Sequence, residues 1–294
     1  MNYSKRILVL EILPENLEWA AGILIAEEVQ TWEEISRRDS LELRTALPKG
    51  IQGKSLLRRL ELGEKNLGCR VFLRKKIQIL KDFTWEKKYL QGLKPFNLPI
   101  PKSPKSRNKK RTPILIDPSG RKNPDSHTLS LTAGMAFGTG THPSTRLAAL
   151  ALQESCLERA TNDLLDVGTG SGILAMVGGL LGVKRIWAVE NDPEALAVAG
   201  RNFKKNRMGF VQSRENLTGV RGKFQVVTAN ILAPVLTELK SKILARTRMG
   251  GDIILSGLTY REIPVMLKVY HECRLIRRYN LKGWSALRLR KTKA

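Results

Sequence analysis

The chain has 294 residues, of which 42% are hydrophobic and 27% are charged, so it can form one large or two modest domains with a buried core. No apolar run is long enough to span a membrane, and three widely separated cysteines exclude a disulfide framework, which together favour a reducing cytoplasm. The cysteines and three scattered histidines do not form a zinc pattern, so we expect no metal. The net charge of +24 favours an anionic partner, such as nucleic acid or a ribonucleoprotein.

Two segments concentrate this positive charge. Residues 70–111 contain fourteen Lys or Arg against two acids, and residues 274–293 contain eight bases and no acid. We therefore expect contact with rRNA through these basic segments, with an ordinary solvated surface as the alternative.

Residues 1–92 predict a small α+β domain. Four strands are expected from apolar or alternating residues, at 5–12, 29–35, 41–47 and 71–80. One helix is expected to begin at Pro14 and another to cover 51–62, where the leucines share one face. The resulting order, strand–helix–strand–strand–helix–strand, is ferredoxin-like.

A basic linker and a second domain are expected to follow. Residues 93–112 contain four prolines among Lys and Arg, which is typical of an extended linker. Residues 113–294 predict a doubly wound, Rossmann-like α/β domain, since strands and helices alternate from about residue 163. Its expected strands are 164–167, 185–189, 224–229, 252–256 and 284–289. Such repeated strand–helix units predict a parallel sheet covered by helices on both faces, including one helix over 234–245.

A glycine-rich turn follows the first strand of this second domain. Residues 166–172 read Asp-Val-Gly-Thr-Gly-Ser-Gly and lead into a helix, where doubly wound sheets bind their ligands. Glycine lets the backbone turn tightly and approach a ligand closely. A dinucleotide fingerprint needs G-x-G-x-x-G, but here Ile173 occupies the place of the last glycine.

Two acids accompany the turn. Asp166 precedes Gly168 by two residues, where it is expected to bind an ammonium group directly or through water. Glu190 ends the next strand, where its carboxylate is expected to accept both ribose hydroxyls. The pattern suits a ligand that carries a charged amino acid, such as S-adenosylmethionine, better than a nicotinamide dinucleotide or an empty turn.

A family resemblance rests on residues 135–145, which read Met-Ala-Phe-Gly-Thr-Gly-Thr-His-Pro-Ser-Thr. This segment resembles the signature of the PrmA family, the methyltransferases that modify ribosomal protein L11. Other segments that match the family are 166–174, 191–195, 230–233 and 250–257. The chain departs from the family pattern at Ser144, which is usually Thr, at Glu190 and Gln225, which are usually Asp, and at 131–134, which replace an Asp-Pro pair.

The resemblance implies an S-adenosylmethionine-dependent enzyme that methylates Lys side chains or the N-terminal amine of a ribosomal protein, with 1–92 recognising the substrate. It implies cofactor contacts from Thr145, Gly168, Glu190 and Asn230. The same site is expected to include Asp166, Gly170, Thr141 and Phe137.

Asn230 is also the expected catalytic residue, because its amide carbonyl at a strand end can orient an incoming amine. His142 precedes a proline in a glycine-rich loop, so we expect it to order the loop rather than act as a base.

Two other functions stay open. An RNA methyltransferase of the same fold is favoured by the basic linker. A non-catalytic RNA-binding or ribosome-binding module with a relic cofactor site is the other, and the intact glycine turn, Glu190 and Asn230 argue against it.

Overall fold

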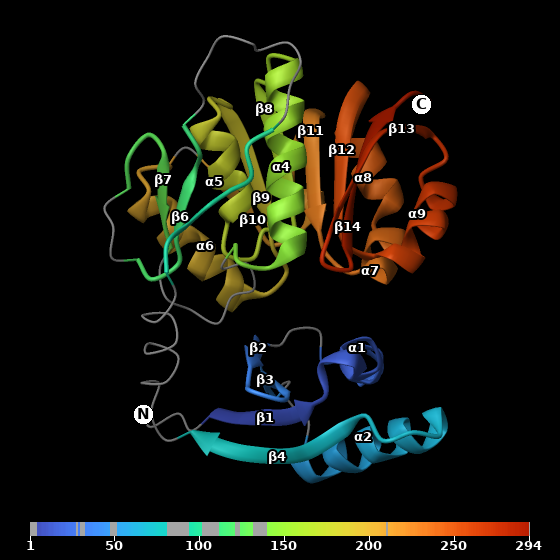
Figure 1. Cartoon of the computed structure of the whole chain (residues 1–294). Helices are drawn as coiled ribbons and strands as arrows, with labels where there is room; N and C mark the ends of the chain where they lie inside the picture. The colour runs from blue at the N-terminus through green and yellow to red at the C-terminus, as the bar shows by residue number, and fades with distance from the viewer. Residues whose placement is uncertain are drawn as a thin grey trace. The chain divides into compact units, whose positions relative to one another are not determined.

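The computed structural model divides the chain into two compact units, Met1–Trp85 and Glu86–Ala294 (Figure 1). The structure describes residues 5–27, 29, 33–47, 52–80, 94–101, 112–120, 124–131, 140–209 and 211–293. The basic part of the expected linker, 102–111, lies outside these residues. No helix among the described residues has the length and apolar character needed to cross a membrane.

The first unit has the expected ferredoxin-like topology. Its elements are β1 (Lys5–Ile12), α1 (Leu17–Ala26), β2 (Glu33–Ser36), β3 (Leu41–Ala46), α2 (Gly53–Leu67) and β4 (Phe72–Leu80). The strands form an antiparallel sheet in the order β2-β3-β1-β4. Alternate residues of β1 share one face, so Leu8 and Leu10 pack with Leu24 of α1 and with Leu56 and Leu60 of α2.

A seven-stranded sheet dominates the described part of the second unit. Its strands are β8 (Asp163–Val167), β9 (Arg185–Val189), β10 (Gln212–Arg214), β11 (Phe224–Asn230), β12 (Thr247–Thr259), β13 (Cys273–Leu281) and β14 (Trp284–Lys291). They are arranged in the order β10-β9-β8-β11-β12-β14-β13.

The expectation of a wholly parallel sheet is wrong at one side, because β14 is antiparallel to both β12 and β13. The cause is the two-residue turn between β13 and β14. Lys282 and Gly283 both have positive φ, 48° and 79°, which is the backbone geometry of a tight hairpin.

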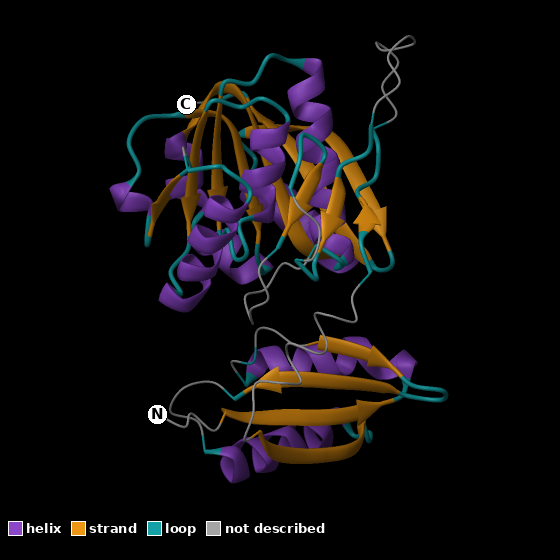
Figure 2. Ribbon diagram, turned by 90° about the vertical axis from the view of Figure 1, so that its left-hand side faces the viewer, coloured by secondary structure: helices purple, strands orange, loops and turns teal. Residues whose placement is uncertain are grey.

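Helices cover both faces of this sheet (Figure 2). One face is covered by α4 (Pro143–Glu158), α5 (Ile173–Leu180) and α6 (Pro193–Lys205). The other is covered by α7 (Ala233–Glu238), α8 (Lys240–Arg246) and α9 (Ile263–Val269). The expected single helix over 234–245 is interrupted at Leu239. Successive strand residues serve opposite faces, as Leu164 and Leu165 do, and this explains why the strands are apolar throughout.

A small sheet was not expected from the sequence. It contains β5 (Phe96–Asn97), β6 (Leu115–Asp117) and β7 (Thr128–Ser130), with β5 antiparallel and β7 parallel to β6. Leu98, next to β5, is buried in the core beside α4. Part of the segment expected as a linker, 94–101, is therefore packed into the second unit.

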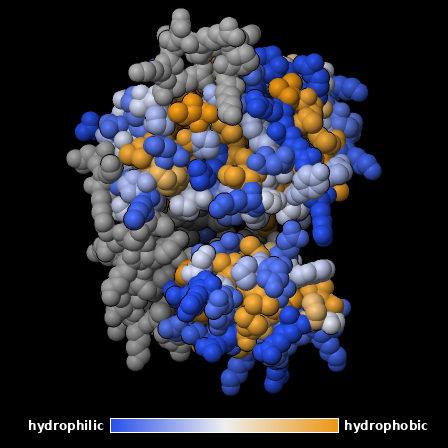
Figure 3. Space-filling view, in the orientation of Figure 1, coloured by the Kyte–Doolittle hydropathy of each residue, from blue (hydrophilic) through white to orange (hydrophobic). Residues whose placement is uncertain are grey.

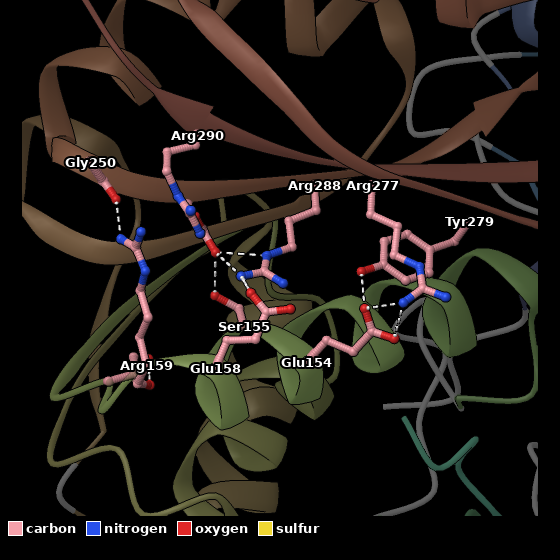
Figure 4. A network of polar contacts seen from close by, with 11 residues as sticks. Glu154, Ser155, Glu158, Arg159, Gly250, Arg277, Tyr279, Arg288 and Arg290 are labelled. Carbon is pink, nitrogen blue, oxygen red and sulfur yellow. Dashed lines mark hydrogen bonds and ion pairs between the residues drawn. The ribbon is translucent and has the colours of Figure 1, made fainter. Parts of the chain in front are cut away.

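A buried polar network joins α4 to the antiparallel side of the sheet (Figure 4). Arg288 is fully buried, and its Nε donates to Asp252 Oδ2 at 2.7 Å. Asp252 also accepts from Arg290 Nε at 2.8 Å and from the Ser155 hydroxyl at 2.7 Å. Burial alone would raise the pKa of Asp252, but the hydrogen bonds from Arg290 and Ser155 and the charge of Arg288 lower it.

Arg288→Met should destabilise the second unit by about 3 kcal/mol, because it removes one partner of a buried ion pair and leaves the carboxylate underpaired. The measurement is urea unfolding followed by circular dichroism. Arg274→Met, at an exposed position of β13, is the matched control and should change stability by less than about 0.5 kcal/mol. Equal unfolding midpoints for the two variants would contradict the importance of the network.

Candidate functional site

Three strand ends bring the expected site residues together. β8 lies between β9 and β11 in the sheet, and all three strands are parallel. Their carboxyl ends therefore share one edge, which holds the turn 166–172 after β8, Glu190 after β9 and Asn230 at the end of β11. This is the edge where doubly wound folds bind ligands.

The glycine turn depends on backbone conformations that side chains disfavour. Gly168, Gly170 and Gly172 have φ of 68°, 54° and 83°. A Cβ on Gly168 would lie 2.4 Å from Ile231 Cγ2, so the β11 loop leaves no room for one. The Gly168 N–H also donates to the Val189 carbonyl at 2.8 Å, which ties the turn to β9.

Asp166 is buried beneath the turn. Its Oδ2 accepts from the Thr169 hydroxyl at 2.6 Å, and its Oδ1 accepts from the Thr228 hydroxyl at 2.7 Å. Burial raises the pKa of the Asp166 carboxyl, and the charge of Glu190 adds to the rise. These contacts make Asp166 an anchor of the turn, and its expected contact with an ammonium group stays a prediction.

The two threonines that hold Asp166 were missed in the sequence. Thr228 precedes Asn230 by two residues on the same strand, so both side chains share one face. That spacing was the available signal for Thr228.

Glu190 links the turn to the next strand. Its Oε2 accepts from the Gly170 N–H at 2.9 Å, and its Oε1 accepts from the Asp192 N–H at 3.2 Å. A carboxylate has about four acceptor positions, so each oxygen can accept a further hydrogen bond. The position therefore combines a structural role with the capacity to bind a pair of hydroxyls.

Thr145 and Asn230 form a second part of the site. Thr145 is fully buried near the start of α4, and Asn230 Nδ2 donates to its hydroxyl at 3.2 Å. Asn230 Oδ1 is buried without a hydrogen-bond partner among the described residues. An unpaired buried carbonyl costs free energy, and a ligand N–H would remove that cost.

His142 caps α4. Its Nδ1 accepts from the Ser144 N–H at 3.3 Å, and its ring packs edge-on against Trp284 with 4.6 Å between centroids. Burial lowers the pKa of His142 to about 4, so the ring is neutral at pH 7. The loop-ordering role expected for His142 agrees with this cap. Trp284, at the start of β14, was not singled out in the sequence.

The two remaining expected site residues precede α4. Thr141 is described and exposed, two residues before the helix begins. Phe137 lies in 132–139, outside the described residues. The expected roles of both residues stay predictions.

The second unit has the fold of class I methyltransferases. The chain matches the crystal structure of ribosomal protein L11 methylase from Lactobacillus delbrueckii subsp. bulgaricus with a TM-score of 0.52 and 29% identity, over 56% of this chain and 86% of that chain. The family model described as Ribosomal protein L11 methyltransferase (PrmA) matches residues 25–292, so the chain belongs to this family. The resemblance seen in the sequence is thereby confirmed.

Curated relatives carry the same description. The Ribosomal protein L11 methyltransferase of Citrifermentans bemidjiense is 38% identical over 169 residues, which are 55% of this chain and 55% of that protein. That of Dictyoglomus thermophilum is 28% identical over 260 residues, which are 86% of this chain and 81% of that protein. The chain thus spans about half the length of the first of these relatives and most of the second.

Acid should destabilise the protein through His142. The pKa of His142 is about 4 in the fold and 6.5 ordinarily, so the unfolded chain binds the proton first as the pH falls. The stabilisation is complete above pH 6.5 and is lost progressively toward pH 4, by up to about 3 kcal/mol. Urea unfolding at stepped pH measures this loss. His142→Asn keeps a capping side chain that does not titrate, so its stability should fall less over this window. Parallel pH profiles would contradict the assignment.

Proposed function

We propose that this chain is an S-adenosylmethionine-dependent methyltransferase that methylates amine groups of ribosomal protein L11, on Lys side chains or the N-terminus. Its membership of the PrmA family supports the reaction class. The observation that carries the proposal is the unpaired Asn230 Oδ1, held beside the glycine turn by the bond from its amide to Thr145. A carbonyl oxygen in this position selects a nucleophile that carries an N–H group.

The acids of the site suit this cofactor. Neither 166–172 nor 189–192 contains a Lys or Arg, whereas both contain carboxylates. A pyrophosphate would meet negative charge here, whereas a sulfonium and an ammonium would be attracted by it. Glu190 would hold the ribose hydroxyls, Gly168 would allow close approach of the ligand, and Asp166 would keep the turn in shape. The bound cofactor supplies the electrophilic methyl group.

The residues of the site supply alignment. Methyl transfer requires the amine, the methyl group and the sulfur to lie in line, so a fixed acceptor for an amine N–H restricts the approach. Asn230 provides that acceptor, and its bond to Thr145 fixes the amide plane. The amine must be neutral to react, although a free lysine titrates near 10.4. The neutral ring of His142, packed on Trp284, adds no positive charge that would repel the amine before it loses its proton.

An RNA methyltransferase of the same fold is the second candidate, and the net charge of +24 favours it. Incubating the full chain with labelled cofactor and either L11 or rRNA distinguishes the two. Transfer to L11, located by peptide mass spectrometry on Lys residues or the N-terminus, supports the proposal. Transfer to rRNA alone would overturn it.

Glu190→Ala should weaken S-adenosylmethionine binding by about ten- to a hundredfold, because a charged acceptor of hydrogen bonds is worth about 1.5–3 kcal/mol. Isothermal titration calorimetry measures the dissociation constant. Glu190→Asp, which restores the acid usual in the family, should bind more tightly than Glu190→Ala. Glu238→Ala removes an exposed carboxylate from α7 and should leave affinity unchanged. Unchanged affinity in Glu190→Ala would refute the assignment.

Asn230→Ala should lower kcat/KM for the amine substrate by about a hundredfold, and more than it weakens cofactor binding, because it removes a preorganised group at the reacting centre. Thr145→Ser keeps the hydroxyl that positions the amide and should retain most of the activity. Thr145→Val lacks it and should lose activity in the same direction as Asn230→Ala. The measurements are steady-state kinetics and calorimetry of cofactor binding. Wild-type kinetics in Asn230→Ala would contradict the role.

A further inference from the structure

A cluster of basic side chains lies at the amino ends of the parallel strands, at the opposite end of these strands from the candidate site. Because β8, β9, β11 and β12 are parallel, the segments that lead into them meet at their amino ends. These segments supply six bases, which we call the basic edge: Arg159, Lys184, Arg185, Arg221, Lys223 and Arg248. These segments lie at the end of the sheet where α4 (Pro143–Glu158) ends in Figure 1, and the surface of the second unit in Figure 3 shows hydrophilic residues interspersed with hydrophobic ones.

Two arginines of the basic edge are fixed in place. Arg185 Nη2 donates to the Lys223 carbonyl at 2.8 Å, and its guanidinium lies 4.7 Å from the centroid of the Phe224 ring. Arg248 Nε donates to the same carbonyl at 3.2 Å. Both arginines also contact the Asp163 carboxylate, at 3.4 and 2.5 Å. One buried carboxylate and one carbonyl therefore hold both guanidinium groups.

The fixed groups remain accessible. The side chains of Arg185 and Arg248 are 41% and 48% exposed, and Asp163 is buried. Arg159 is also anchored, through a 2.9 Å bond from Nη1 to the Gly250 carbonyl. Further donors of these guanidinium groups can therefore reach a ligand at little additional cost in side-chain entropy.

Four segments distant in sequence, each at or just before the start of a parallel strand, present this charge with little acid to balance it. Lys184, Arg221 and Lys223 are exposed and form no ion pair within the described residues. The basic edge continues to the end of β14 (Trp284–Lys291). Arg274 of β13 lies opposite Arg290 of β14 in the strand register, and Arg274 and Lys293 are both exposed.

The chemistry of the basic edge fits phosphate. Planar, preorganised guanidinium groups match pairs of phosphate oxygens. A protein partner would need a larger apolar centre. The exposed large apolar residues in or next to these segments are three separate ones in the sequence, Leu157, Met249 and Leu275.

We propose that the basic edge binds the phosphodiester backbone of a nucleic acid. This second site lies at the opposite edge of the sheet from the methyl-transfer site and does not depend on the proposed reaction. RNA and DNA share the backbone chemistry, so the experiment below separates them.

The test compares two variants with equal loss of charge in the full chain. Lys184→Gln, Arg221→Gln and Lys223→Gln together remove exposed bases of the basic edge. Arg201→Gln, Lys204→Gln and Lys268→Gln together remove exposed bases from α6 and α9. Fluorescence anisotropy with labelled twenty-nucleotide RNA and DNA of one sequence, at stepped salt, gives the affinities, and circular dichroism confirms folding.

The basic-edge variant should bind at least about tenfold more weakly than the control variant, and its salt slope should fall by about 2, since each lost phosphate contact lowers the slope by about 0.7 on single strands. Tighter binding to RNA than to DNA would identify RNA as the occupant, and equal binding would indicate the backbone alone. Equal affinities for the two variants, or no binding by the wild-type chain, would overturn the proposal.

Discussion

The proposed methyl-transfer site depends on one buried carboxylate. Asp166 accepts hydrogen bonds from the hydroxyl of Thr169 in the turn after its own strand and from the hydroxyl of Thr228 in the adjacent strand β11. This one carboxylate therefore fixes the glycine turn relative to the end of β11. Gly168 and Asn230 are placed by this arrangement. Asp166 is buried, so these two hydroxyls, together with a backbone hydrogen bond from Ala175, offset the cost of removing its carboxylate from water.

The second unit separates its charges along the strand direction. Carboxylates gather at the carboxyl ends of the parallel strands, where the proposed cofactor carries positive charge. The guanidinium and ammonium groups of the basic edge gather at the amino ends, where Asp163 pairs with two of the arginines. The basic edge therefore does not bring its positive charge beside the proposed site for a cationic ligand.

Much of this architecture was predictable, because its signals are local. The glycine turn and the strand–helix alternation each depend on neighbouring residues, and the structure has them as expected. The interrupted helix at Leu239, the strand β5 and the antiparallel β14 were not anticipated. Each depends on packing between distant segments or on the two-residue turn between β13 and β14, which the alternation of strands and helices does not predict.

Within the candidate site, too, the positions of residues along the chain were predictable from the sequence, whereas their contacts with distant residues were not. Sequence reasoning placed Asn230 and Glu190 at strand ends, but it did not show that Asp166 faces inward toward Thr169 and Thr228. Nor did it bring together the basic edge, whose members come from four separate segments at the starts of the parallel strands. Such groups become neighbours only once the order of the strands is known.

The position of β14 has a consequence for biosynthesis. Although it follows every other strand of the sheet in the chain, it lies between β12 and β13 rather than at an edge. A nascent chain that has reached β13 still lacks Arg288, the buried partner of Asp252. The sheet of the second unit therefore closes only after residues 284–291 have emerged from the ribosome, whereas the first unit can fold earlier.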